Sequence, residues 1–158
     1  MQVRQIPMAQ LRELIDEQLA HGEALLPVTG NSMWPLLAGG RDMVRLTRLD
    51  RRVQRGDIVL YQRADGSYIL HRVIRLSASG DCICCGDAQW EREQVDEAQI
   101  IAYVTAFRRK GRWRETARSR RYRLYERFWV HTFPARRPLL RLLRSLQRAR
   151  RGLIRGRR

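Results

Sequence analysis

The sequence predicts a mainly β protein: a compact, mostly antiparallel barrel or sandwich, with a short helix before it and basic helices after it. Two patterns lead to this fold class. Between residues 24 and 107, short segments rich in Val, Ile, Leu and Tyr alternate with turn-forming stretches such as "AGGRD", "ADGS" and "SASGD". Beyond Arg108, the composition changes to arginine mixed first with aromatic residues and then with leucine.

The predicted elements follow one another simply along the chain. Residues 8–21 form an amphipathic helix ended by Gly22, because apolar residues recur there at helical spacing (Met8, Leu11, Leu14, Ile15 and Leu19). The strands lie in the segments "ALLPV", "DMVRLTRL", "DIVLYQR", "SYILHRVIRL", "DCICCG" and "IIAYVTAF". The stretch "YQRADGSYIL" predicts a β-hairpin, since a turn-forming "ADGS" separates two strand-like runs.

Charge divides the chain into two predicted regions. Residues 1–107 carry 12 Lys and Arg against 14 Asp and Glu, a net charge of −2, and form the predicted globular domain with its N-terminal helix. Residues 108–158 carry 20 basic against 2 acidic residues, a net charge of +18. We expect this tail to form one or two basic helices, because its leucines recur at helical spacing among arginines (Leu139, Leu142, Leu143 and Leu146).

Three kinds of partner fit such a tail: an anionic membrane surface, an acidic partner such as a leader peptide, or nucleic acid. Leucines on one side of the last helix and arginines on the other suit a peripheral position in a lipid interface. The aromatic residues from Trp113 to Phe133 have the shape to stack on bases, but aromatics at helical spacing more often pack against their own domain. We therefore expect domain packing for the aromatics, and rank membrane or acidic partner before nucleic acid for the helix.

Cysteine usage and the lack of long apolar runs bear on compartment and cofactors. Cys82, Cys84 and Cys85 are an odd number of cysteines, too closely spaced for a disulfide framework. Their spacing is not the C-x-x-C of zinc sites, so we expect Cys82 and Cys84 to fill core space and predict no metal and no cofactor. The sequence shows neither a signal-peptide core nor a membrane-spanning run. We expect a cytoplasmic protein, peripheral to the inner membrane surface if the tail binds lipid.

The stretch "NSMWP" places Ser32 where the chain leaves the apolar run "ALLPV". A serine after Gly-Asn is commonly a turn hydroxyl, and it acts as a nucleophile only where a neighbouring base accepts its proton. Of the three histidines, one ends the first helix and one lies in the tail, which leaves His71. Strand alternation puts His71 on the face of Ile69 and Val73, where desolvation favours the neutral, proton-accepting imidazole. A structural, hydrogen-bonded histidine is the alternative.

A series of short blocks resembles the superfamily of type I signal peptidases and LexA-like self-cleaving repressors. In order, the blocks are "GNSMWP", "RDMVRL", "RGDIVLYQ", "YILHRVI", "CGDA" and "IIAYV", within residues 26–107. The box "GNSM" at residues 30–33 is similar to the nucleophile box of the LexA branch. His71 precedes Arg72-Val73, as the histidine base does in the endoplasmic reticulum, archaeal and sporulation-type branch. The resemblance implies the LexA/signal-peptidase-like barrel and a serine-type peptidase.

Carried over to this sequence, the resemblance implies that Ser32 is the nucleophile and His71 the general base of a Ser/His dyad. Asp87, in the Gly-Asp box, matches the carboxylate that orients the imidazole or buttresses the site, and a turn role for Asp87 stays open. Gly30 stands where signal peptidases often carry a serine, which leaves backbone N–H groups, including that of Ser32, for the oxyanion hole. The family's second acid has three candidates here: Glu91, Glu93 and Asp96.

The expected function is therefore a serine endopeptidase, resembling signal peptidase, that cleaves a leader or signal-like peptide through an acyl-enzyme. Neither the membrane anchor of type I signal peptidases nor the DNA-binding domain of LexA-like repressors is expected. The chain resembles instead the small signal-peptidase-like proteins of bacterial peptide-modification systems. The alternative is a non-catalytic module with the peptidase fold that binds membrane or nucleic acid through its basic tail.

Overall fold

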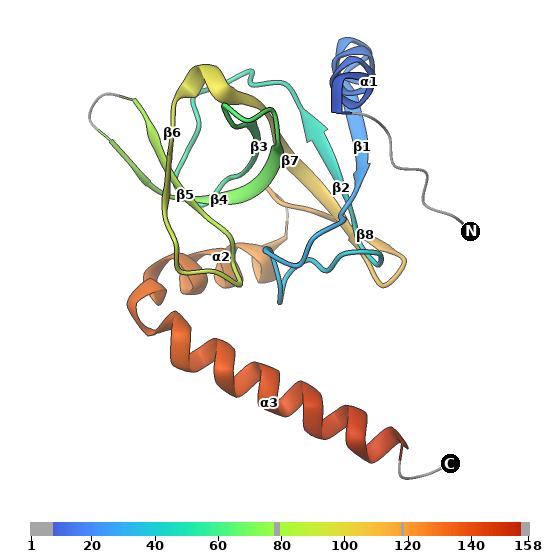
Figure 1. Cartoon of the computed structure of the whole chain (residues 1–158), viewed down its shortest axis with the longest axis vertical. Helices are drawn as coiled ribbons and strands as arrows, with labels where there is room; N and C mark the ends of the chain where they lie inside the picture. The colour runs from blue at the N-terminus through green and yellow to red at the C-terminus, as the bar shows by residue number, and fades with distance from the viewer. Residues whose placement is uncertain (1–7, 78–79, 118, 156–158) are drawn as a thin grey trace.

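The computed structural model describes residues 8–77, 80–117 and 119–155. The chain folds into a mainly antiparallel sheet of eight strands, with one helix before the sheet and two after it (Figure 1). The mainly β class, the short N-terminal helix and the basic C-terminal helices are therefore confirmed.

The elements lie close to their predicted positions. Helix α1 spans Met8–Ala20. The strands are β1 (Glu23–Pro27), β2 (Met43–Thr47), β3 (Ile58–Gln62), β4 (Tyr68–Leu76), β5 (Cys82–Cys85), β6 (Glu93–Val95), β7 (Ile100–Arg109) and β8 (Arg112–Glu115). The C-terminal helices are α2 (Arg120–His131) and α3 (Arg136–Arg155), and 3-10 turns η1 (Glu97–Gln99) and η2 (Phe133–Ala135) precede β7 and α3.

The strands follow the order β1-β2-β7-β3-β4-β5-β6, and β8 pairs with β7 off this path. Every pairing is antiparallel. Among the described residues, the end strands β1 and β6 do not pair, so the sheet is not closed. The predicted hairpin forms from β3 and β4, and its turn uses Gly66 at φ 83°, a left-handed conformation that glycine adopts without steric cost.

Two clusters of buried side chains form the core. The larger one joins α1 to the sheet through Ile15 and Leu19, and it includes Met33 and Leu36 from the loop after β1. The smaller one lies between β3, β4 and β5 and includes Cys82 and Cys84, as predicted. The sheet contributes to the core through apolar residues on alternating positions of β2 and β7, as expected for strands with one buried face.

The predicted division between residues 107 and 108 falls inside β7, which continues to Arg109, turns at Lys110-Gly111 and returns as β8. β8 escaped prediction because its sequence, "RWRE", is mostly charged. Beyond β8, helix α2 buries Tyr122 and Trp129, which pack on their own domain as expected, whereas Phe128 and Trp113 are exposed.

Helix α3 extends away from the sheet (Figure 1). Arg136 and Leu140 in its first turns are buried, whereas Leu142 and Leu146 are 57% and 54% exposed. No described helix is long and apolar enough to cross a membrane.

Candidate active site

Ser32 lies in the loop after β1, between an exposed Asn31 and a buried Met33. Met33 and Leu36 anchor this loop in the core. The side-chain oxygen of Asn31 accepts a hydrogen bond from the Gly39 N–H at 3.1 Å and so closes the loop on itself. The apolar residues that surround Ser32 in the sequence thus fix its backbone and leave the serine itself partly accessible.

His71 lies in β4 and is only 6% exposed. Burial lowers the pKa of its imidazole from 6.5 to about 4, and the negative charge of Glu93 acts in the opposite direction. The ring is therefore neutral at physiological pH. The sequence-based expectation of a desolvated, proton-accepting His71 agrees with this environment.

Gly86, directly after β5, lies between Ser32 and His71. A Cβ on Gly86 would lie 2.6 Å from the Ser32 carbonyl oxygen and 3.1 Å from His71 Nε2. The Ala88 N–H also donates a 2.7 Å hydrogen bond to the Ser32 carbonyl. The serine backbone and the Nε2 edge of the imidazole are therefore neighbours across a glycine that has no room for a side chain. Among the described residues, no hydrogen bond joins Ser32 Oγ to His71 Nε2.

The opposite edge of the imidazole faces a tyrosine. Tyr61 Oη lies 3.2 Å from His71 Nδ1 and donates a 2.7 Å hydrogen bond to Glu93. Arg63 binds both oxygens of the Glu93 carboxylate, at 2.6 and 2.7 Å. The hydrogen bond from Arg63 is the main cause that lowers the pKa of Glu93, so this carboxylate stays charged. His71 thus connects through Tyr61 to a fixed anion.

The hydrogen bonds from His71 through Tyr61 to Glu93 indicate which nitrogen of His71 carries the proton. Burial raises the pKa of Tyr61, so its hydroxyl keeps its single proton, and that proton is donated to Glu93. Tyr61 Oη can then only accept from His71, which puts the imidazole proton on Nδ1. Nε2, on the Gly86 side, is left as the proton acceptor. A general base facing Ser32 requires this tautomer.

Tyr61 is the site residue that sequence reasoning missed. It pairs with Ile69 in the β3–β4 ladder, while His71 pairs with Val59, so the two side chains are diagonal neighbours on one face. A tyrosine in "DIVLYQR" is typical of a strand, and only the register of the hairpin shows that it reaches the histidine. Of the three candidates for the second acid, Glu93 is the one that Tyr61 connects to His71.

Among the described residues, no hydrogen bond joins Asp87 to His71, so of the roles considered for Asp87 a direct contact with the imidazole is not seen. Its carboxylate makes two 2.8 Å hydrogen bonds to Arg72, and both side chains are fully buried. Tyr125 donates a third hydrogen bond to Asp87, at 3.0 Å. His71 and Arg72 are adjacent on β4, so their side chains point to opposite faces of the strand. Asp87 lies on the face of Arg72. Asp87 therefore supports the loop of Gly86 rather than the imidazole directly.

The two other acidic candidates lie elsewhere. Glu91 is exposed, and Asp96 caps the short helix η1. Lys110, the single lysine of the sequence, lies in the β7–β8 turn, so the lysine base of other peptidase branches has no counterpart next to Ser32. Among the described residues, no protein group accepts a hydrogen bond from the Ser32 N–H, which is therefore free to serve an oxyanion.

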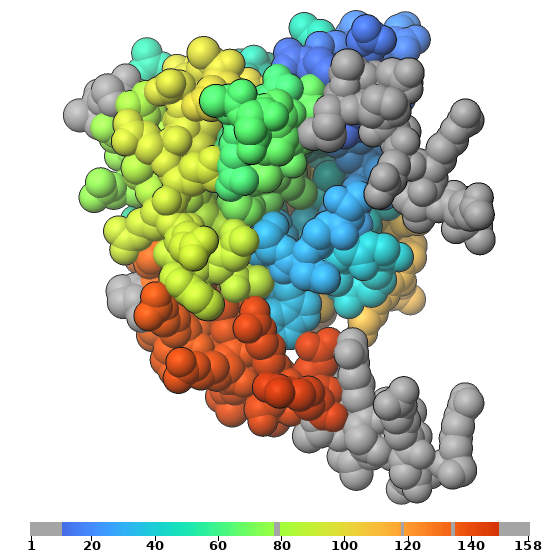
Figure 2. Space-filling view, viewed as in Figure 1, coloured from blue at the N-terminus to red at the C-terminus, as the bar shows by residue number. Residues whose placement is uncertain are grey.

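The C-terminal helices hold the Gly86 loop in place. Trp129 of α2 donates a 3.1 Å hydrogen bond to the Asp87 carbonyl, and Arg136 at the start of α3 donates a 3.0 Å hydrogen bond to the Gly86 carbonyl. Figure 2 shows the yellow-green segment that follows β5 in direct contact with the orange-red C-terminal helices. Arg136 is buried and donates hydrogen bonds to the Gly86 and Gln89 carbonyls and to the Trp129 carbonyl of α2, so it joins this loop to the helix.

Together these groups form a buried, neutral imidazole with an oriented tautomer beside a half-buried serine. Such a pair is chemically suited to acyl transfer, in which the imidazole takes the serine proton during attack on a carbonyl. No protein-family model and no curated protein sequence matches this chain.

Proposed function

We propose that this chain is a serine endopeptidase that uses Ser32 as nucleophile and His71 as general base, on a sheet of the LexA/signal-peptidase type. The observation that carries the proposal is the approach of both residues to Gly86, with the acceptor nitrogen of His71 on the side of the serine. The sequence resemblance supports the proposal as well, because it implies the same two residues.

In the proposed reaction, Ser32 Oγ attacks the peptide carbonyl carbon while His71 Nε2 takes the hydroxyl proton. The negative charge that develops on the carbonyl oxygen is stabilised by the backbone N–H of Ser32. The imidazolium then gives its proton to the departing amine, which leaves an acyl-enzyme. Water, deprotonated by the neutral His71, attacks the ester and regenerates the serine.

Tyr61 and Glu93 act as positioning residues in this scheme. The Tyr61 oxygen accepts a hydrogen bond from the Nδ1–H of His71, and the charged Glu93 stabilises the imidazolium that forms during attack, since it raises the pKa of His71. The substrate class we propose is a leader or signal-like peptide, on the resemblance described above.

A fluorophosphonate probe that reacts with activated serines tests the proposal. We expect covalent labelling of the wild-type protein, mapped to Ser32 by mass spectrometry, and none of Ser32→Ala. Ser145→Ala is the matched control, because Ser145 is exposed on α3 and should not affect labelling. A native, folded wild-type protein that resists the probe would favour the alternative of a non-catalytic binding module.

A second candidate function, contact with an anionic membrane surface, is favoured by one observation on α3. Arg137, Arg141, Arg144 and Arg148 recur on one face of this helix, and Leu142 and Leu146 are exposed on the opposite face. α3 carries no acidic residue, so a second α3 is electrostatically unsuited to cover these leucines. A lipid interface accommodates both faces.

Sedimentation with phosphatidylglycerol vesicles measures this contact. We expect the full chain to bind these vesicles and to bind neutral phosphatidylcholine vesicles much more weakly. Leu142→Glu with Leu146→Glu should abolish binding, whereas Leu14→Glu with Leu25→Glu, two exposed leucines near the N-terminus, should not. Equal loss in both double variants would refute a role for α3.

A further inference from the structure

A surface cavity of about 490 Å³ lies between the β7–β8 hairpin and the start of α2, apart from the proposed catalytic residues. Its rim is strongly basic, and no acidic residue lines it. Five cationic side chains surround it: Arg109, Lys110, Arg112, Arg114 and Arg121.

Three arginines of the hairpin share one face. Arg109 of β7 pairs directly with Arg112 of β8, and Phe107 pairs with Arg114. Because side chains alternate along a strand, these four residues share one side of the hairpin. Trp113 points the other way and stacks against Arg45, at 5.1 Å from guanidinium carbon to ring centre. Like charges directly opposite each other destabilise a strand pair, so this face lowers stability unless an anion binds there.

None of the five cations forms a salt bridge with a carboxylate of the described residues. This contrasts with Arg63 and Arg72 near the proposed active site, each of which holds a carboxylate with two hydrogen bonds. Arginine binds carboxylates and phosphates in the same two-pronged way. The rim of the cavity therefore has unused capacity for an anionic ligand.

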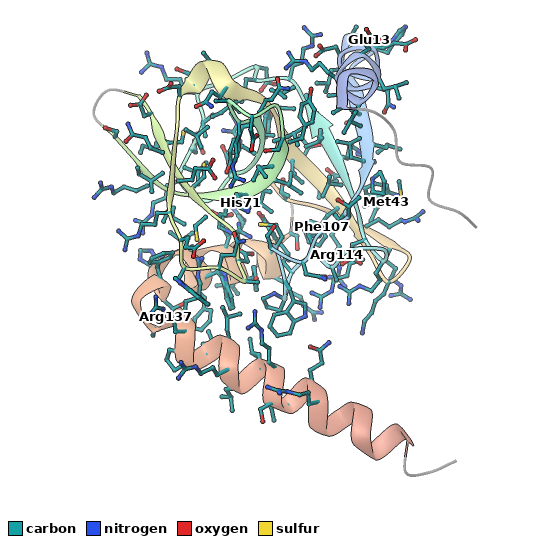
Figure 3. All side chains as sticks on the ribbon, viewed as in Figure 1. Glu13, Met43, His71, Phe107, Arg114 and Arg137 are labelled. Atoms are coloured by element: carbon teal, nitrogen blue, oxygen red, sulfur yellow. The ribbon has the colours of Figure 1, made fainter. Side chains whose placement is uncertain are left out.

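The floor of the cavity connects it to the proposed active site. It includes Leu36, which belongs to the loop of Ser32, and Tyr125, whose hydroxyl binds Asp87 next to Gly86. Phe107 and Tyr122 complete an apolar surface beneath the basic rim. Figure 3 labels Phe107 and Arg114 close together, on the side of the sheet toward the C-terminal helices.

We propose that this cavity binds an acidic segment of the peptide substrate, with carboxylates on the arginine rim and an apolar side chain on the floor. The proposal rests on the peptidase function proposed above and adds a substrate class to it: peptides with an acidic segment that binds apart from the catalytic residues. A peptide is favoured over nucleic acid because the cavity belongs to the domain of the proposed peptidase, and the displacement experiment below separates the two occupants.

The probe for this site is a short fluorescein-labelled peptide of alternating glutamate and leucine, and binding is followed by fluorescence anisotropy. The full-length Ser32→Ala protein is used so that the peptide is not cleaved. We expect saturable binding that weakens with salt, and no binding of the matched glutamine–leucine peptide. Arg112→Gln with Arg114→Gln should weaken binding by about tenfold or more, the loss expected for two charge-assisted contacts.

The control is Arg52→Gln with Arg55→Gln, which removes the same charge from two exposed arginines between β2 and β3. We expect this variant to bind within about twofold of the parent, which separates site binding from general charge attraction. The cavity variant should unfold at the same or a higher temperature, because it removes like charges from the hairpin.

Three outcomes would overturn the proposal: equal binding of the glutamine peptide, equal loss in both double variants, or full binding by the cavity variant. Displacement of the peptide by oligothymidylate or by phosphatidylglycerol vesicles, bound more tightly and through the same two arginines, would reassign the cavity to nucleic acid or lipid. These results are independent of probe labelling at Ser32, so failure of the cavity proposal and failure of the peptidase proposal can be told apart.

Discussion

At the scale of single residues, the proposed chemistry depends on how His71 is held. Its buried ring has one edge toward Tyr61 and the other toward Gly86, and these contacts fix its tautomer. In a Ser-His-Asp triad an aspartate fixes the tautomer by accepting a hydrogen bond directly from the histidine. Here a tyrosine carries the contact and Glu93 supplies the charge behind it.

Tyr61→Phe tests this arrangement. The variant keeps the ring but removes the hydroxyl between His71 Nδ1 and Glu93. We expect the rate of probe labelling at Ser32 to fall by about tenfold to hundredfold, part of the contribution that a positioned base makes. Tyr103→Phe is the control, because it removes a hydroxyl that binds an exposed aspartate elsewhere. Equal rates for wild type and Tyr61→Phe would exclude Tyr61 from positioning the base.

Gly86→Ala tests the close approach of Ser32 and His71. The added methyl group would overlap the Ser32 carbonyl and touch the imidazole, so the serine loop must move away. We expect labelling to be lost while circular dichroism still shows a folded sheet. Gly30→Ala is the matched control, since a Cβ on Gly30, two residues before the serine, meets nothing within 4 Å. Normal labelling of Gly86→Ala would contradict the geometry proposed for the dyad.

At the scale of elements, the C-terminal helices belong to the frame of the proposed site. α2 reaches the Gly86 loop through Tyr125 and Trp129, and α3 reaches it through Arg136. The basic tail thus has two parts: buried contacts from Tyr125, Trp129 and Arg136 hold the Gly86 loop, whereas most of the arginines and Leu124, Leu142 and Leu146 are exposed. Charge counts along the sequence do not distinguish these two parts.

Asp87→Asn distinguishes a structural from a catalytic role for this carboxylate. The variant leaves the buried charge of Arg72 without its partner, so we expect unfolding to become easier by about 3–5 kcal/mol. Asp57→Asn, which breaks a more exposed pair with Arg51, should cost about 1 kcal/mol or less. Chemical denaturation measures both. An Asp87→Asn protein of normal stability but greatly reduced labelling would show instead that Asp87 acts in catalysis.

The elements themselves were largely predictable. α1, the β3–β4 hairpin and the central strands follow from local patterns of apolar residues, which the core then uses. β8 was not predictable, because "RWRE" is mostly charged and is a strand only through its pairing with β7. The partners of Asp87 and His71 were not predictable either, since they depend on which face of β4 each residue occupies.

At the scale of the whole molecule, acidification should weaken the fold through His71. The pKa of this histidine is lower in the folded protein than its ordinary value of 6.5, so the unfolded chain takes up a proton first as the pH falls. The contribution of His71 to the free energy of unfolding is therefore fully present above pH 6.5 and is lost as the pH falls toward about 4. We expect a loss of roughly 3 kcal/mol from this group.

Denaturant titrations between pH 7 and pH 4 measure the effect. The pKa values of Asp42 and Glu93 are also lowered in the folded protein, so protonation of these carboxylates at the acid end of this range lowers the free energy of unfolding further. A His71→Gln protein isolates the contribution of the histidine and should show a weaker pH dependence than wild type. Identical slopes for the two proteins would mean that His71 titrates normally in the folded state.

The central claim, that a desolvated His71 activates Ser32, is tested most directly by the pH dependence of fluorophosphonate labelling at Ser32. We expect the rate to stay constant from neutral pH down to about 5 and to reach half its maximum near the lowered pKa of about 4, with no reaction in His71→Gln. A midpoint at 6.5, or undiminished labelling of His71→Gln, would contradict the claim.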